Sequence, residues 1–299
     1  MSAEDIMGKA AIIAIEKFAE KGLDKISNAI GVVFPFHDTK RIAIQTYIDE
    51  IQKSDRVSEE KLWVIYNLKS TIKQLNNQIK IAEIAYDSAK EGTVFSEESK
   101  VDDEWLDRYL DSAKFVSDEE MQSLWGKILA GEFEKPNSVP IRIMRVLSET
   151  NAFYAKIFEN VCHLAVNIVP VYADNNTSIP INCVFVPMSE FDEGYLGELQ
   201  VTYNNVKELE TLGLLSVDNL LGFKSLLIDR TAEEAIVQYG DKTGKVKIYQ
   251  NEIPVGQIKL TEVGECIRRF ITPKIINQHF EEVINYIKEY EIVYDVIRK

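Results

Sequence analysis

The chain has 299 residues, of which 45% are hydrophobic and 27% charged, so it can form two or three globular domains. Its formal net charge of −14 at pH 7 disfavours long-range attraction to nucleic-acid phosphates and to anionic membranes. The three cysteines, Cys162, Cys183 and Cys266, form no CxxC pair, which argues against a disulfide framework and indicates a reducing compartment. The sequence also has no signal-peptide pattern and no apolar run long enough for a membrane helix, so we expect a cytoplasmic protein.

Residues 1–92 have the periodicity of long helices. Apolar side chains recur at spacings of three and four over residues 6–30, over 39–53 and from Ser58 to Tyr86. The last stretch predicts either a rod or a coiled hairpin, and we expect Trp63 to anchor packing between helices. Because a short bundle cannot bury this much apolar surface, we expect self-association through the N-terminal helices.

Residues 101–166 predict a compact all-helical domain, which follows a polar boundary segment at 91–100. Asp102 is a good helix N-cap, and Ser117 to Glu120 has the spacing of a capping box. Gly131 is the expected end of the second helix. Trp105 and Trp125 fall on apolar helix faces, where they should anchor packing. Two more helices are predicted over 141–147 and 153–164.

Residues 167–299 predict an α+β domain with a helical tail after Pro273. Short strands are predicted over 166–169, 181–186, 214–217, 226–229, 235–239, 246–250 and 257–260. A helix that ends at Gly213, a β-rich segment and a helix from Thr261 to Phe270 together outline a winged helix. The predicted fold class is therefore mainly α with a smaller α+β part.

The candidate recognition helix of the winged-helix unit, residues 204–211, is poorly suited to DNA. It carries Lys207 against Glu208 and Glu210, whereas contact with DNA phosphates needs lysine or arginine. We interpret the unit as a protein-binding or packing module, and a DNA-binding transcriptional regulator is the alternative.

The segment from Gly240 to Lys245 has the composition of a phosphate-binding loop without its spacing. Three residues rather than four separate Gly240 from Gly244, and Val246 follows the lysine where serine or threonine is required. A hairpin turn between two strands is the favoured interpretation.

The histidines His37, His163 and His279 form no HExxH pair and no zinc-site spacing with a cysteine. Cys162 and His163 are neighbours in a predicted helix, which directs their side chains to different faces. A buried thiol and an imidazole on the polar face are therefore favoured over a nucleophile–base pair.

Two acidic clusters and one lysine-bearing helix have alternative interpretations. Residues 102–104 and 118–120 could bind a metal, but both begin predicted helices, where carboxylates cap free amides and favour the helix dipole. The first helix could lie on a membrane through Lys9, Lys17, Lys21 and Lys25. Five acidic residues offset these four lysines, so packing into a bundle or dimer is favoured over lipid binding.

Two runs in the middle of the chain resemble a bacterial family of unknown function. They are Asp103 to Tyr109 (DEWLDRY) and Val116 to Glu132 (VSDEEMQSLWGKILAGE). The family's Pro-containing loop corresponds to residues 136–138, in which Asn137 stands for its glycine, and its later elements resemble residues 206–215 and 260–264. This resemblance covers roughly residues 65–270 and implies no known chemistry. The run at 117–130 is also similar to the Abi-alpha abortive-infection proteins, which implies a role in phage defence.

We therefore expect a non-catalytic bacterial protein that senses or scaffolds by binding other macromolecules, with a protein partner or a second copy of itself. No catalytic, cofactor-binding or metal-binding residue and no cofactor is predicted. The alternatives are the transcriptional regulator and an enzyme whose site is assembled from scattered residues.

Overall fold

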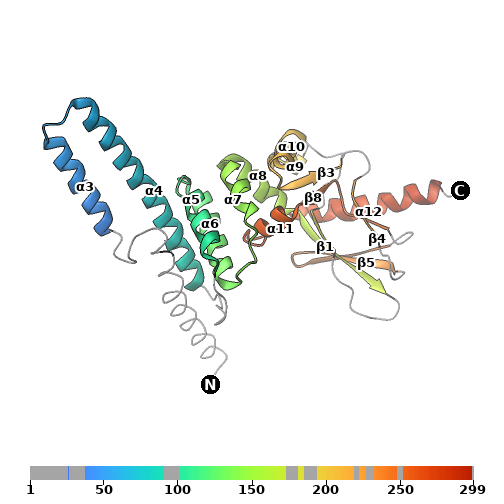
Figure 1. Cartoon of the computed structure of the whole chain (residues 1–299). Coiled ribbons are helices and arrows are strands. Elements are labelled where there is room, and N and C mark those ends of the chain that lie inside the picture. The colour runs from blue at the N-terminus through green and yellow to red at the C-terminus, as the bar shows by residue number, and fades with distance from the viewer. Residues whose placement is uncertain are drawn as a thin grey trace, which may run out of the picture. The chain divides into compact units, whose positions relative to one another are not determined.

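A computed structural model describes residues 26, 38–90, 101–172, 181–184, 194–218, 222–226, 232–247 and 252–297. The chain divides into two compact units, Met1–Ser148 and Glu149–Lys299, whereas the sequence predicted three domains at 1–92, 101–166 and 167–299. The fold is mainly helical with a smaller α+β part, as predicted (Figure 1). Most of the first predicted helix, His37, and the polar segments at 91–100 and 173–178 lie outside the described residues.

Two helices form a hairpin in the first unit (Figure 1). They are α3, Asp38–Lys53, and α4, Ser58–Lys90, which confirms the two predicted helices. The 33 residues of α4 form one continuous helix. The stretch from Ser58 is therefore a single rod, and the alternative prediction, that this stretch folds back on itself as a coiled hairpin, is wrong. Ile48 and Ile51 of α3 are buried, as are Leu75 and Ile79 of α4.

Three shorter helices follow in this unit: α5, Asp103–Ala113, α6, Glu119–Glu134, and α7, Arg142–Glu149. Asp102 caps α5 as predicted, because its carboxylate accepts the Trp105 N–H at 2.8 Å. The capping box assigned to Ser117 is wrong. Asp118 is the N-cap of α6 and accepts the Met121 N–H at 3.0 Å, since its carboxylate already faces the free amides.

The helix end predicted at Gly131 is also wrong, because α6 continues to Glu134. The buried Glu132 explains the later end, since its carboxylate accepts the N–H groups of Asn137 at 2.6 Å and Val139 at 2.8 Å. These bonds fix the loop that follows the helix. Asn137 has a φ of 63°, a left-handed conformation that asparagine tolerates better than most residues. Asn137 can therefore occupy the position at which the family that the sequence resembles has glycine.

Aromatic side chains hold α5 against α6. Tyr109 stacks on Trp105 with ring centroids 4.8 Å apart and meets Trp125 at 4.9 Å. The Tyr109 hydroxyl donates to the Trp125 carbonyl, and the Trp105 indole donates to the Val139 carbonyl at 3.0 Å. Both tryptophans are buried, which confirms their predicted packing role. The same prediction is wrong for Trp63, whose side chain is 70% exposed, because α3 packs against another side of α4.

The second unit begins with α8, Ala152–His163, and contains a six-stranded antiparallel sheet. Its strands run in the order β3, β8, β2, β1, β5, β6, and their bounds are β1 Ala165–Tyr172, β2 Ile181–Val184, β3 Leu215–Val217, β5 Ala232–Tyr239, β6 Lys242–Lys247 and β8 Ile258–Leu260. The short strands β4, Lys224–Leu226, and β7, Glu252–Pro254, form a separate pair. The remaining helices are α9 Gly194–Glu198, α10 Tyr203–Thr211, α11 Glu262–Arg268 and α12 Asn277–Ile297.

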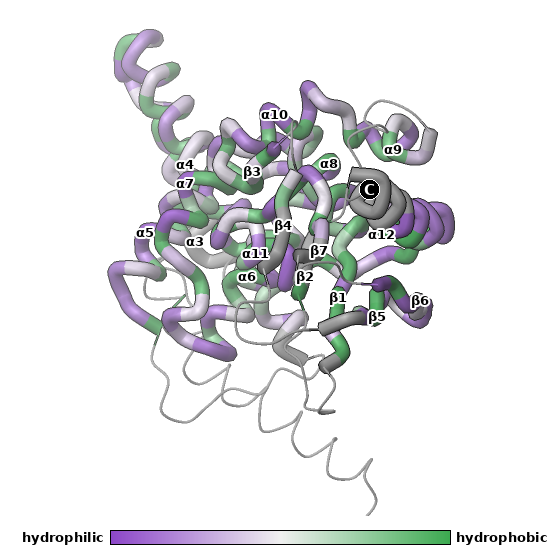
Figure 2. Tube along the Cα trace, turned by 90° about the vertical axis from the view of Figure 1, so that its right-hand side faces the viewer, coloured by the Kyte–Doolittle hydropathy of each residue, from purple (hydrophilic) through white to green (hydrophobic). Residues whose placement is uncertain are grey.

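The core of this unit lies between the sheet and α12. It contains buried side chains from β1, β5, β6 and α12: Val166, Ile168, Ala235, Val237, Tyr239, Val246, Val283 and Ile287. In Figure 2, α12 lies beside β1, whose tube is coloured as mostly hydrophobic. The helix can approach β6 closely because Gly244 has no side chain, and a Cβ there would lie 2.7 Å from Ile284 Cδ1.

Substitution of Gly126 tests the contact between α4 and α6. A methyl group on Gly126 would lie 2.4 Å from Ile84 Cγ2 and 3.1 Å from the Ile81 carbonyl oxygen. We expect Gly126→Ala to lower the free energy of unfolding by about 1–2 kcal/mol, because overpacking outweighs the helical preference of alanine. Denaturant unfolding followed by tryptophan fluorescence measures the change. Lys127→Ala on the exposed side is the control, and equal stability of the two variants would contradict the packing.

Candidate functional site

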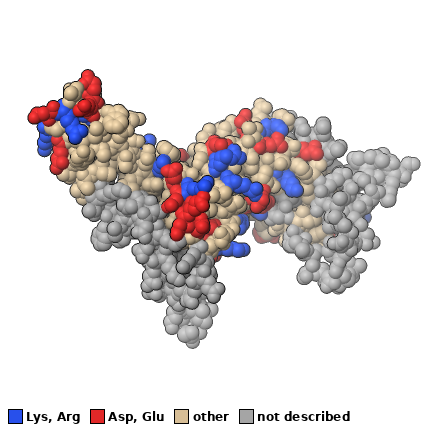
Figure 3. All heavy atoms as spheres, in the orientation of Figure 1, with Lys and Arg blue, Asp and Glu red and all other residues tan. Residues whose placement is uncertain are grey.

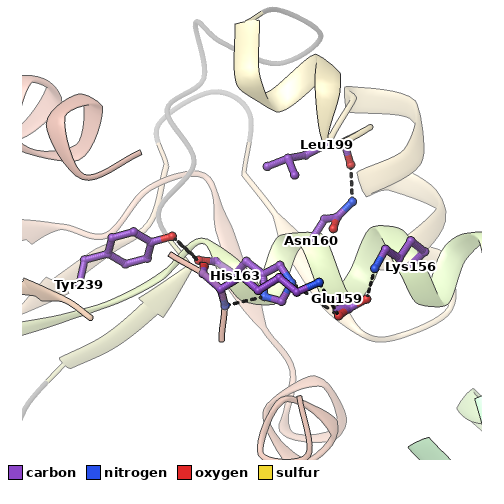
Figure 4. Close-up of polar contacts among 7 residues, drawn as sticks. Lys156, Glu159, Asn160, His163, Leu199 and Tyr239 are labelled. Atoms are coloured by element: carbon purple, nitrogen blue, oxygen red, sulfur yellow. Dashed lines mark hydrogen bonds and ion pairs between the residues drawn. The ribbon is translucent and has the colours of Figure 1, made fainter. Parts of the chain in front are cut away.

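The sequence candidates Cys162 and His163 end α8, where a group of polar side chains gathers (Figure 4). Asn151 starts this helix by accepting the Tyr154 N–H at 2.9 Å. Glu159 lies four residues before His163, so the helix places both side chains on one face. Their geometry decides whether this group can act on a substrate.

His163 is held by a hydrogen bond at one ring nitrogen, and its other ring nitrogen faces a carboxylate. Its Nδ1 accepts the Lys274 N–H at 3.3 Å, which leaves the proton on Nε2. Nε2 lies 3.6 Å from Glu159 Oε1 and has no hydrogen-bond partner within the described structure. Burial lowers the pKa of His163, although the charge of Glu159 opposes this effect. The side chain is buried, so the predicted placement on the polar face is wrong, because the segment before α12 covers it.

Glu159 is the charged member of the group. Its other carboxylate oxygen lies 2.5 Å from Lys156 Nζ, and Lys274 Nζ lies 3.9 Å from Oε1. Burial would raise the pKa of Glu159, but the hydrogen bond from Lys156 and the nearby positive charges outweigh it and lower the pKa. Glu159 therefore stays ionised and is already neutralised by its neighbours.

Tyr239 joins the sheet to the same place. Its hydroxyl donates to the His163 carbonyl at 2.7 Å and accepts the Ile276 N–H at 3.0 Å. Burial raises its pKa, so the hydroxyl keeps its proton at neutral pH. The sequence offered no signal for this role, because 76 residues separate Tyr239 from His163.

The third predicted histidine, His279, is fully buried nearby. Its Nε2–H donates to the Leu164 carbonyl at 3.0 Å, and its Nδ1 accepts the Tyr195 hydroxyl at 2.8 Å. Its ring meets the Tyr239 ring edge to face, with centroids 5.2 Å apart. Burial lowers the pKa of His279 to about 4, so the ring is neutral at physiological pH.

These contacts attach α12 and the segment before it to the end of α8 and to β5. Both ring nitrogens of His279 are hydrogen-bonded, whereas His163 has one hydrogen-bonded nitrogen and a second, buried one that lies 3.6 Å from the Glu159 carboxylate. Cys162 is buried, as predicted, and burial raises the pKa of its thiol far above neutral, so it carries no nucleophilic thiolate. The arrangement is therefore suited to anchoring α12 rather than to general acid–base or nucleophilic chemistry.

The other sequence candidates fall into structural positions. The hairpin predicted at Gly240 to Lys245 is confirmed, with Gly240 at φ 61° in a two-residue turn, although Lys242 to Gly244 already belong to β6. The acidic clusters begin α5 and α6, and within the described residues no three histidine, cysteine or acidic side chains could hold a metal. Among the helices described, none is long and apolar enough to cross a membrane.

A shallow groove of about 540 Å³ lies between α5 and α7 of the first unit. Its lining carries charges of both signs, from Asp107, Asp111, Arg108 and Arg145. Arg108 is already bound to Glu104 at 2.6 Å, and Figure 3 shows acidic side chains gathered over α5 and α6 with basic ones beside them. This mixture does not select an anion or a cation.

The first half of α4 carries an exposed apolar surface; the sequence predicted excess apolar surface in the N-terminal helices but did not locate it on this face. We call it the aromatic patch: Leu62, Trp63 and Tyr66, whose side chains are 69%, 70% and 73% exposed. The signal was the run of apolar residues from Leu62 to Tyr66, which is too wide for one partner helix to cover. In Figure 3 the end of the α3–α4 hairpin carries charged side chains and is followed by an uncharged stretch.

A family model described as a protein of unknown function (DUF2806) matches residues 66–284. No curated protein and no solved structure matches the chain.

The buried histidine at the start of α12 should make stability depend on pH. The pKa of His279 is about 4 in the folded chain and about 6.5 in the unfolded chain, so the unfolded state binds more protons between these values. We expect about 3 kcal/mol of stability to be present above pH 6.5 and to be lost as the pH falls towards 4. His163 adds a change in the same direction.

Denaturant unfolding of the second unit, measured across this pH range, tests the effect. His279→Gln keeps a donor and an acceptor but does not titrate, so its stability should depend less steeply on pH. His37→Gln is a matched control elsewhere in the chain. An unchanged pH dependence in His279→Gln would show that the ring is not buried as a neutral group.

Proposed function

The chain belongs to this family of proteins of unknown function, and we propose that it acts by binding other macromolecules, as a sensing or scaffold protein. The observation that carries the proposal is the aromatic patch on α4. Tryptophan and tyrosine dominate the binding energy of protein interfaces, and contiguous apolar surface on a soluble protein marks such sites. A rigid helix that presents these side chains loses little conformational entropy on binding.

The chemistry of the second unit supports binding rather than catalysis. Its buried histidines and Tyr239 serve as anchors between segments, and the Cys162 thiol stays protonated. A catalytic group needs an atom that can meet its substrate, and burial keeps the rings of His163 and His279, 3% and 0% exposed, away from solvent.

We also infer a winged-helix arrangement in the second unit. The helices α9 and α10 lead into β3, which pairs with β8, and β8 pairs on its other side with β2, the strand that precedes both helices. A winged helix has this order of helices and strands. Since fold alone does not define function, the surface of α10 decides what the unit binds.

The surface of α10 favours a protein-binding or packing role. Its one lysine, Lys207, pairs with Glu210, whose carboxylate also accepts the Val217 N–H at 2.8 Å. The hydrogen bond that Lys207 donates to Glu210 raises the pKa of Lys207, so the charge is present but already paired. Glu208 is exposed on the same helix and would repel phosphate.

The regulator alternative rests on the strand order and makes a distinct prediction. A DNA-binding winged helix would retard duplex DNA in a gel at low salt, with binding that weakens steeply as salt rises. We expect no retardation at micromolar protein. A salt-sensitive shift that Lys207→Glu abolishes and Lys127→Glu on α6 preserves would favour the regulator over the binding protein proposed here.

The resemblance to Abi-alpha proteins suggests phage infection as the setting in which a partner is met. We propose to place a photo-crosslinking phenylalanine at Tyr66 and to irradiate bacterial cells that express the full chain, with and without phage. We expect discrete protein adducts from position 66.

Phe115 provides the matched control position, because its side chain is 69% exposed but lies outside the aromatic patch. Adducts at position 66 that are absent at position 115 would support the proposal. Equal labelling at both positions, or none at either, would contradict it.

A further inference from the structure

The first half of α4 presents a face that is ordered by charge. Spacings of three and four residues align its members, which we call the α4 stripe: Glu59, Leu62, Trp63, Tyr66, Lys69 and Lys73. All six side chains are exposed. The stripe is acidic at its start, apolar and aromatic in its middle and basic at its end. No ion pair between described residues engages Glu59, Lys69 or Lys73.

The stripe continues a packing face of the same helix. Ile65, Leu68 and Ile72, which are partly buried, lie outside the stripe on another side of α4. Beyond Lys73 the face of the stripe is covered, since Asn77 donates to the Lys114 carbonyl at 2.8 Å and Ile84 packs against Gly126. The helix therefore uses this face for packing in its second half and exposes it in its first half.

The order of charges fits a second copy that runs in the opposite direction. If the two helices cross at Tyr66, Glu59 lies seven residues before the crossing and Lys73 seven residues after it. Each Glu59 then meets Lys73 of the second copy. Trp63 and Lys69 lie three residues on either side, so the indole of one copy lies at the level of the lysine of the other, where a positive charge near the ring is favourable. The two Tyr66 rings meet at the axis.

A parallel pair of helices would not have these contacts. It would set Glu59 against Glu59 and Lys73 against Lys73, and like charges in contact are destabilising. An antiparallel pair also satisfies two-fold symmetry, the commonest symmetry of protein dimers, because the same surface serves both copies.

We propose that two copies of this chain associate through the α4 stripe, antiparallel, with Tyr66 at the two-fold axis. The inference deepens the proposed function, on which it rests, by naming the partner of the aromatic patch as the chain itself. The apolar side chains supply most of the binding energy, and the Glu59–Lys73 pairs set the direction, because exposed ion pairs contribute little affinity.

Sedimentation of the purified full chain at micromolar concentration tests the surface. We expect a dimer, and Trp63→Ala should weaken it at least about tenfold, because the substitution removes an aromatic anchor from both copies. Phe115→Ala removes an aromatic ring of similar exposure outside the stripe and should leave the dissociation constant unchanged. A monomer at tens of micromolar, or a dimer that Trp63→Ala does not weaken, would overturn the proposal.

Charge reversal tests the direction. We expect Glu59→Lys and Lys73→Glu each to weaken the dimer about fivefold or more, because either substitution turns both ion pairs into like-charge pairs. The double variant, Glu59→Lys with Lys73→Glu, should return to near the original affinity, as should an equal mixture of the two single variants. Glu134→Lys on α6 is the control for a change in net charge. A double variant as weak as the singles would refute the antiparallel arrangement.

The two proposals can fail separately. If the purified chain is monomeric and position 66 still crosslinks to another protein in cells, the inference of self-association is wrong and the proposed function stands. If the chain is monomeric and position 66 gives no specific adduct, both are wrong.

Discussion

The structure depends on how the apolar surface of one long helix is shared among its neighbours. The 33 residues of α4 carry apolar side chains on several sides, and α3 can cover only one of them. In the second half of α4, α6 covers another of these sides, because Gly126 of α6 has no side chain and lets the helix approach Ile84 of α4 closely. The first half keeps Leu62, Trp63 and Tyr66 exposed. Exposed aromatic surface of this kind is retained where a partner covers it, which connects the packing of the helix to the proposed function.

The second unit illustrates how buried polar groups can be structural. Burial disfavours the charged form of an imidazole, so a buried histidine is stable when it is neutral and each nitrogen has a suitable neighbour. His279 meets this condition through Leu164 and Tyr195, and Tyr239 binds the backbone on both sides of the same junction. Side chains of these types can serve in catalysis, but His279 and Tyr239 instead hold α12 against the sheet.

Local signals predicted the elements well, and contacts between distant residues set the limit. The N-cap at Asp102, the long helix from Ser58 and the β5–β6 hairpin follow from spacing and capping rules. The end of α6 did not, because the carboxylate of Glu132 binds amides beyond the helix. For the candidate site, the sequence indicated a buried Cys162 but not a buried His163, whose cover comes from Lys274, 111 residues away. Periodicity alone also could not tell which apolar side of α4 would lack a neighbour, so Trp63 was expected to anchor packing between helices.

The central claim is that the exposed face of α4 is an interface and that a second copy covers it. Disulfide trapping measures this most directly, with Glu59→Cys and Lys73→Cys made in separate copies of the full chain and mixed under mild oxidation. We expect a crosslink between positions 59 and 73 of different copies, and little crosslinking when either variant is oxidised alone. Equal crosslinking of each variant with itself, or none in the mixture, would contradict it.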